Sequence, residues 1–564
     1  MVHSAIFTTL LLSGSSLAAI VPYNFRIRNV QAAPDGFQRS VVSVNGLIPG
    51  TLITANKGDT LLINVTNELT DASMRRATTI HWHGLFQSTT ASEDGPAFGM
   101  LLCNTMPDLS VQLLHVSDSS WTADWNLLVI TRSHRVIRYT DMKRFVGIIA
   151  TYHRNTLTAF EAHFSYRYSK DISTYSHTTI IDPQDPHRNR YDVDDASTVI
   201  TLDDWYHTPA PTLQAQFFDT NNTALAAPVP DAGLINGRGR YLNGPQVPRT
   251  VINVQRGRRY RLRIINTSSI GSYTFSIENH RMTIIEADGI SHQPLIVDSF
   301  QIYAGQRYSV VVEANQTIAN YWIRSPMTVA NAANNANLDA TNVFAVLRYQ
   351  GAPNAEPTTE QGTAIGTPLV EENLHALINP GAPGGSNPAD VQVNLTIGRT
   401  TIDGKVAFTF NGIQYKSPSL PTLLKILANN ATTNADFGTD EHTLALPFNK
   451  TIELVITGGV DHPIHLHGHV FDVVQSLGGS INYVNPPRHD VVRVSSTGVI
   501  LRFRTDNPGP WFVHCHIDWH LEAGLAVVFA EAPDQARIGP QRVVPAPGWD
   551  QLCPKYTALS ADLQ

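Results

Sequence analysis

The sequence predicts an all-β protein made of three consecutive sandwich or barrel domains. Short runs of β-branched and apolar residues recur along the chain and are interrupted by Gly, Pro, Asn and Asp, as is typical of sandwiches and barrels. Helical periodicity is scarce, with 421–427 as one short candidate. A chain of 564 residues is long enough for three domains that each bury a core.

The strand-like runs set the expected domain limits. Representative runs are 60–65, 251–254, 260–265, 308–312, 452–456 and 499–503. A similar turn precedes three of them, at Lys57-Gly58-Asp59, Gln255-Arg256-Gly257 and Asn449-Lys450, which suggests repeated domains. Polar, Pro-containing linkers are expected near 182–191 and 351–363. We therefore predict domains over 19–185, 186–350 and 351–564.

The composition and the first residues predict a secreted protein. Residues 1–18 read as a signal peptide, with an apolar stretch at 5–12 and a small-x-small pattern at Ser16-Leu17-Ala18. No later stretch is apolar for long enough to span a membrane. Charged residues make up only 15%, with 40 basic against 47 acidic. This net charge of -7 argues against nucleic acid as a partner.

Glycosylation and cysteine content agree with secretion. Candidate glycosylation sites occur at Asn64, Asn221, Asn266, Asn315, Asn394, Asn430 and Asn449. The chain has three cysteines. If Cys515 is a metal ligand, Cys103 and Cys553 remain, either as a disulfide in an oxidising compartment or as two unpaired thiols.

The segment His514-Cys515-His516 is the strongest indication of function. On a β-strand the two histidines would point to one side and Cys515 to the other. One strand could thus serve two metal sites back to back. A thiolate with two imidazoles and a weak or missing axial donor is the pattern of blue copper. The sequence therefore predicts copper and electron transfer.

Two more histidine clusters reinforce this prediction. They are His81-Trp82-His83-Gly84 and the segment from His462 to His469, which reads His-Pro-Ile-His-Leu-His-Gly-His. A single His-x-His on a strand is usually incidental. Three such clusters in a chain with 22 histidines favour metal binding over chance.

These three clusters resemble three of the four signatures of the multicopper oxidases. The segments 94–98, 234–240 and 508–512 make the chain most similar to basidiomycete-type fungal laccases, over residues 20–98 and 181–564. The resemblance implies cupredoxin-like Greek-key domains and a secreted, monomeric oxidase with four coppers. It would couple one-electron oxidation of phenols or aromatic amines to four-electron reduction of O₂ to water. Lignin modification or phenolic detoxification would be its role.

The resemblance also implies a ligand set. A mononuclear type 1 copper would be held by His462, Cys515 and His520, with Leu525 at the axial position. Leucine cannot donate to copper, which favours Cu(I) and a high potential. The type 2 copper would take His81 and His465. The type 3 pair would take His83, His467, His514 and His516.

Two carboxylates match functional residues of the family. Asp94 matches an aspartate near the type 2 copper that assists proton delivery, although an Asp before Gly95 can also simply form a turn. Asp231 matches an aspartate in the substrate pocket, although it can also be an exposed loop acid. His207 is expected to be structural rather than a ligand.

The interval 99–180 departs from the family. The second signature, a Trp-x-His-Ser-His segment, is absent, and the scattered His115, His134, His153, His163 and His177 lack its spacing. The interval is either an inserted recognition loop or a retained intron or frameshift in the gene. We favour the second, because an insertion need not erase two ligands.

This departure keeps other functions open. Each type 3 copper would lose one imidazole, so we expect the trinuclear cluster to bind copper poorly. The chain would then be a catalytically impaired copper glycoprotein. A ferroxidase, a further alternative, would need acidic residues beside His462 and His520. Cys103 lies near the position of the family disulfide, which would pair it with Cys553.

Overall fold

The strands of the computed structural model form six sheets, which fall into three pairs along the chain. The structure describes residues 19–74, 76–96, 110–113, 146–154, 168–169, 175–360, 366–402, 404–459, 461–476 and 478–545. The predicted signal peptide, Cys103 and Cys553 lie outside these ranges. The prediction of an all-β fold with three cupredoxin-like domains is confirmed.

The first domain consists of a sheet ordered β2-β1-β4-β6 and a sheet ordered β3-β9-β7-β5, with β8 paired to β7. Its strands are β1 (Ile20–Ala32), β2 (Arg39–Val44), β3 (Ile53–Asn56), β4 (Thr60–Glu68), β5 (Ala77–Trp82), β6 (Ser110–Leu113), β7 (Val146–Arg154), β8 (Tyr168–Ser169) and β9 (Tyr175–Ile181). A short 3₁₀ turn, η1 (Ala91–Glu93), follows β5.

The second domain pairs a sheet ordered β12-β11-β10-β14-β19-β16-β17 with one ordered β13-β22-β20-β15-β18, to which β21 adds. Its strands are β10 (Val199–Trp205), β11 (Ala232–Ile235), β12 (Arg238–Gly239), β13 (Val251–Val254), β14 (Arg259–Asn266), β15 (Ser272–Ile277), β16 (Met282–Ala287), β17 (Ile290–Val297), β18 (Ser299–Ile302), β19 (Arg307–Glu313), β20 (Asn320–Arg324), β21 (Met327–Thr328) and β22 (Phe344–Tyr349).

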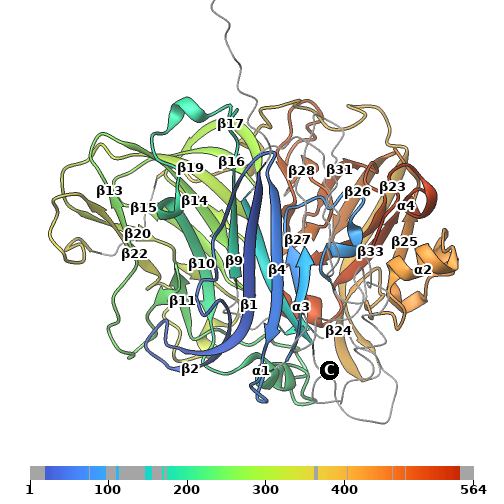
Figure 1. Cartoon of the computed structure of the whole chain (residues 1–564), viewed down its shortest axis with the longest axis horizontal. Coiled ribbons are helices and arrows are strands. Elements are labelled where there is room, and N and C mark those ends of the chain that lie inside the picture. The colour runs from blue at the N-terminus through green and yellow to red at the C-terminus, as the bar shows by residue number, and fades with distance from the viewer. Residues whose placement is uncertain are drawn as a thin grey trace, which may run out of the picture.

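The third domain pairs a sheet ordered β24-β23-β26-β31-β28-β29 with one ordered β25-β33-β32-β27-β30. Its strands are β23 (Val391–Ile402), β24 (Lys405–Phe410), β25 (Thr443–Leu446), β26 (Thr451–Thr457), β27 (His462–Leu466), β28 (Phe471–Gln475), β29 (Arg488–His489), β30 (Val491–Val494), β31 (Val499–Arg504), β32 (Gly509–Cys515) and β33 (Ala526–Glu531). Figure 1 shows β1 and β4 in blue across the middle of the molecule, with the second domain to the left and the third to the right.

Helices are short and lie between strands. They are α1 (Ala210–Phe217), α2 (Thr422–Asn429), α3 (Asp518–Glu522) and α4 (Pro533–Ile538), and further 3₁₀ turns are η2 (Arg188–Arg190), η3 (Ala196–Thr198), η4 (Ala332–Asn334), η5 (Glu371–Asn373), η6 (Asn434–Asp436) and η7 (Thr439–Glu441). The helix expected at 421–427 is thus present as α2. Among the described residues, no helix combines the length and the apolar character that crossing a membrane requires.

The recurring turn of the sequence occupies the same place in all three domains. In each, the first strand pairs antiparallel with the next and parallel with a later one, as β1 does with β2 and β4. β10 pairs in this way with β11 and β14, and β23 with β24 and β26. The recurring turn precedes the later, parallel strand. Each turn holds a residue of positive φ, namely Gly58, Gly257 or Asn449, which glycine and asparagine tolerate best.

Packing joins the second domain to the third. The largest apolar core contains the interior of the third domain together with Tyr206, Leu213 and Phe217 of the second. Phe217 and Trp519 of α3 lie with ring centroids 5.5 Å apart, and Gln214 donates to Glu522 at 2.7 Å. Helix α1 therefore supports α3, which carries His520.

One predicted glycosylation site is wrong. Asn266 is fully buried, and its amide donates to the carbonyls of Gly271 at 2.9 Å and Ile302 at 3.0 Å. A side chain used in this way cannot carry a glycan in the folded protein. Asn64 is half-buried, whereas exposed sites remain at Asn221, Asn315, Asn394, Asn430 and Asn449.

Glycan mapping of the secreted protein tests this correction. We expect occupancy at some of the five exposed asparagines and an unmodified peptide at Asn266. Asn315→Gln is a suitable control, because it removes one exposed acceptor site and should leave folding unchanged. A glycan found on Asn266 would contradict the described packing.

Candidate metal centre

Three side chains from one domain converge on a candidate mononuclear site. His462 begins β27, Cys515 ends β32 and His520 lies in α3. Cys515 Sγ lies 3.5 Å from His462 Nδ1 and 3.6 Å from His520 Nδ1. The two Nδ1 atoms are 3.0 Å apart. A thiol and two imidazoles that meet in this way fit a copper ion.

Burial prepares this site for a metal. Burial lowers the pKa of His462 to about 4, so the imidazole is neutral and has a lone pair to donate. Burial also raises the pKa of the Cys515 thiol. A thiolate there needs a cation to replace lost hydration. The donor set is therefore better suited to a bound metal than to an apo state.

Apolar groups surround the mononuclear site. The Leu525 side chain is fully buried. Its backbone contacts two of the proposed ligands, since Cys515 N donates to Leu525 O and Leu525 N donates to His520 O. The Phe408 ring lies 4.3 Å from that of His520. His520 itself is half-buried, so it is the ligand nearest to solvent.

Six further histidines meet between the first and third domains. His81, His465 and His467 offer nitrogen atoms within 4.8 Å of one another. His467 Nε2 lies 3.1 Å from His514 Nε2, and His516 Nε2 lies 3.3 Å from His83 Nδ1. The neighbours of Cys515 thus reach this second site while Cys515 reaches the first.

The hydrogen bonds at this second site orient the histidine rings as metal ligands. His467 Nδ1 lies 2.6 Å from Asp94 Oδ2, and His514 Nδ1 lies 2.9 Å from Cys515 O. Each Nδ1 must donate there, so with neutral rings both Nε2 atoms turn lone pairs toward each other. His465 Nδ1 likewise donates to the carbonyl of Asp490, and within the described part of the chain its buried Nε2 has no hydrogen-bond partner. Such an arrangement fits copper bound to the Nε2 atoms.

Asp94 joins the two domains. It is fully buried, and its carbonyl accepts from His81 Nδ1 at 2.6 Å while its carboxylate accepts from His467. Burial alone would raise the pKa of Asp94, but His467 and His81 hold it well below the usual range. Asp94 therefore stays ionised beside the cluster.

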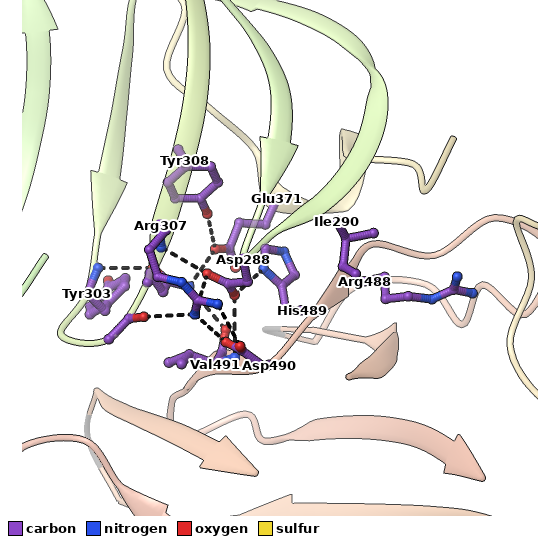
Figure 2. Close-up of polar contacts among 12 residues, drawn as sticks. Asp288, Ile290, Tyr303, Arg307, Tyr308, Glu371, Arg488, His489, Asp490 and Val491 are labelled. Atoms are coloured by element: carbon purple, nitrogen blue, oxygen red, sulfur yellow. Dashed lines mark hydrogen bonds and ion pairs between the residues drawn. The ribbon is translucent and has the colours of Figure 1, made fainter. Parts of the chain in front are cut away.

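Further charged residues lie beside the histidines, and the sequence did not predict them. Figure 2 shows Arg307 of β19 aimed at Asp490, with Asp288 and His489 beside it. Arg307 Nη2 lies 2.7 Å from Asp490 Oδ2, and His489 Nδ1 lies 2.9 Å from Asp288 Oδ2. These residues belong to no spaced motif, so no local signal could have found them.

The first domain lacks histidines where the third domain has them. β27 pairs with β32 so that His465 faces His514, and β5 pairs with β7 so that His81 faces Ala150. In the same register, Ala150 occupies the position that corresponds to His514, and Tyr152 the position that corresponds to His516. Of the scattered histidines, His153 lies on β7 and His177 on β9, while His115, His134 and His163 lie outside the described residues.

Hydrogen bonds hold Asp231 near the contact between the first two domains. It is buried, and it accepts from the backbone N–H of His207 at 2.7 Å and from the Asn337 amide at 2.8 Å. His207 Nε2 lies 2.7 Å from Asp35 Oδ2 and its ring stacks on Phe37. His207 thus makes structural contacts, and Asp231 is no exposed loop acid.

Comparisons with known proteins agree with this geometry. The multicopper oxidase family matches residues 26–111, 196–352 and 415–535. The chain is 65% identical to Laccase-4 of Thanatephorus cucumeris, over 91% of this chain and 90% of that protein. It is 42% identical to Laccase-2 of Agaricus bisporus, over 98% and 97%.

Solved structures show the same likeness. The multicopper oxidase Fet3p, which functions in iron import, superposes with a TM-score of 0.77 at 25% identity, covering 97% of this chain and 98% of that one. The laccase from Botrytis aclada gives 0.75 at 27%, covering 96% and 93%.

Buried Glu93 predicts a pH dependence of stability. Burial raises the pKa of Glu93 from 4.5 to about 8, so the folded protein holds this proton more tightly than the unfolded chain. Its contribution is complete below pH 4.5 and is lost as pH rises toward 8. We expect Glu93→Gln to flatten the fall in unfolding free energy between pH 5 and 8, measured by denaturant unfolding. An unchanged slope in Glu93→Gln would contradict the assignment.

Proposed function

The chain belongs to the multicopper oxidase family as a laccase-type oxidoreductase, and on this premise we propose that it oxidises phenols or aromatic amines one electron at a time and reduces O₂ to water. The observation that carries the proposal is the back-to-back geometry at β32. Cys515 contacts His462 and His520, while His514 and His516 contact His467 and His83.

We assign the ligands accordingly. His462, Cys515 and His520 would hold the type 1 copper, with Leu525 as a non-coordinating axial neighbour. His81 and His465 would hold the type 2 copper, and the type 3 pair would use His83, His467, His514 and His516. When bound, copper would supply the one-electron redox chemistry. Cys515 is covalently continuous with His514 and His516, so the chain itself connects the two sites.

Two carboxylates would handle protons. Asp94 stays ionised and accepts from His467, so as a buried anion it would assist proton delivery by drawing protons toward the cluster. Asp231 would accept a hydrogen bond from a phenol. Asp231 accepts from the backbone of His207, and the residue before it, Tyr206, accepts from Trp519 Nε1 of α3 at 3.3 Å. A phenol bound beside His520 of α3 would therefore lie on the side of the molecule where Asp231 is held.

A second candidate follows from the register of the first domain. Ala150 and Tyr152 stand where the third domain has histidines, which favours a copper glycoprotein with an incomplete trinuclear cluster. Ferroxidase activity is less well supported. The carboxylate next to His462 is Asp461, and Arg493 neutralises it at 2.7 Å.

The site would act outside the cell. We propose that residues 1–18 direct secretion, that the mature protein is a monomer over domains 19–185, 186–350 and 351–564, and that it oxidises phenols in lignin modification or phenolic detoxification. The exposed sequons support this, since glycosylation occurs on secreted chains. Cys103 and Cys553 remain the proposed disulfide.

Oxygen uptake and copper content together test the function. For the purified protein with a simple phenol, the proposal predicts O₂ consumption and a blue absorption band. Cys515→Ser should abolish the band and the uptake, because a hydroxyl is a poor ligand for this copper, while copper at the histidine cluster is retained. Bleaching of the band by phenol without O₂ uptake, with clearly fewer than four coppers per chain, would instead support the incomplete cluster.

The role of Asp231 has its own test. Asp231→Asn should lower kcat/KM for a phenol by roughly ten- to a hundred-fold, because a hydrogen bond to a charged group is worth about 1.5–3 kcal/mol. The blue band should be unchanged. Asp534→Asn, a change at an exposed carboxylate of α4, is the control and should match the parent. Equal kcat/KM in Asp231→Asn and the parent would refute the assignment.

A further inference from the structure

The second domain supplies none of the proposed ligands, yet one of its loops reaches the copper cluster. This loop connects β18 to β19 and contains Gly305, whose φ is +85°. A Cβ on Gly305 would lie 2.5 Å from the His516 ring. The loop backbone therefore rests directly on a proposed type 3 ligand, and only glycine fits there.

Arg307, at the end of this loop, joins all three domains. Its side chain is 2% exposed, and its guanidinium pairs with both carboxylate oxygens of Asp490, with Nη1 2.5 Å from Oδ1 and Nη2 2.7 Å from Oδ2. Nη1 also lies 3.0 Å from His83 Nε2 of the first domain. Two-pronged arginine pairing of this kind is strong and fixes geometry.

Asp288 holds Arg307 in place from behind (Figure 2). Asp288 Oδ1 accepts from the Arg307 backbone N–H at 2.9 Å and from Nη1 at 3.3 Å. A Cβ on Gly84 would lie 2.7 Å from Arg307 Nη2, so the first domain closes over the guanidinium. Asp288, Asp490 and Gly84 therefore hold the Arg307 side chain in one position.

Asp490 lies close enough to the cluster to bind a metal. Its carboxylate and the ring nitrogens of His83 and His465 fall within 4.8 Å of one another. Two imidazoles and a carboxylate make an effective site for divalent metals. The carboxylate oxygens are both taken by Arg307, whose charge also repels a cation. The pairing therefore decides whether Asp490 can compete for the metal.

We propose that Arg307 is a positioning residue that withholds Asp490 from the cluster and orients His83, so that the protein atoms offered to the cluster coppers are imidazole nitrogens. The proposal rests on the proposed assignment of the cluster ligands. Without Arg307, Asp490 would be a buried carboxylate that keeps only imidazole neighbours such as His83, whose Nε2 lies 3.5 Å from Oδ1, and it would turn to a bound metal ion. The type 2 copper, proposed at His81 and His465, would then gain an oxygen ligand beside His465.

Electron paramagnetic resonance of the copper-loaded protein tests this role. In Arg307→Gln, the type 2 copper signal should shift toward oxygen ligation, with weaker nitrogen superhyperfine structure. The double variant Arg307→Gln/Asp490→Asn should recover the parent pattern, because the competing oxygen is gone. Arg307→Lys should fall between them, since it keeps the charge but loses the two-pronged grip.

Controls separate this role from general destabilisation. Arg261 is an equally buried arginine that pairs with Glu286 at 2.6 Å, and Arg261→Gln should leave the type 2 signal at the parent pattern. The blue band of the mononuclear copper reports whether each variant has folded. If Arg307→Gln fails to fold, Arg307→Lys decides instead, and its signal should shift part of the way toward oxygen ligation.

The outcomes are distinct. A type 2 signal in the parent that is unchanged in Arg307→Gln, or not restored in the double variant, overturns the role of Arg307. Loss of an oxygen ligand in Asp490→Asn overturns it as well, because Asp490 would already bind the metal. A parent without any type 2 signal refutes the ligand assignment under the proposed function, and the role of Arg307 with it.

Discussion

The hydrogen bond from His467 Nδ1 to Asp94 Oδ2 connects the first domain to the third at the candidate cluster. β5 and the residue after it bring two imidazoles from one domain, and the ends of β27 and β32 with the residues just after them bring four from the other. Those six rings can share metals only if the docking of the first domain on the third holds them in a fixed arrangement. Asp94 contributes by holding His467 with its carboxylate and His81 with its carbonyl, so both rings turn Nε2 inward.

The same arrangement makes the centre unfavourable without a cation. Burying so many neutral imidazoles forgoes their hydration, and the facing Nε2 atoms of His467 and His514 oppose one another. A bound metal would convert both features into favourable contacts. Metal binding and domain docking are therefore expected to stabilise each other. Arg307 extends this coupling to the second domain, since it bonds a residue of the third beside His83 of the first.

The three domains share one topology but differ in chemistry. Each has a first strand that pairs parallel with a later strand after a turn of positive φ. The third domain carries histidines on β27 and β32, whereas the first has them on β5 and has Ala150 and Tyr152 on β7. The second domain has none of the proposed ligands and contributes packing and charge. The strand pairing that the three domains share is thus compatible with different side chains at the metal-site positions of each domain.

Local patterns were enough to predict much of this protein. The alternation of a strand is local, so the sequence alone determined that His514 and His516 differ in direction from Cys515, and turn residues marked the strands of three β domains. The sequence did not reveal that Asn266 is buried, that Asp231 is framed by His207 and Asn337, or that Arg307 grips Asp490. These contacts join residues far apart in the chain, and only the packing of one domain on another brings them together. Tertiary structure therefore decided which polar groups surround the ligands, because burial and charge pairing depend on neighbours that sequence spacing does not specify.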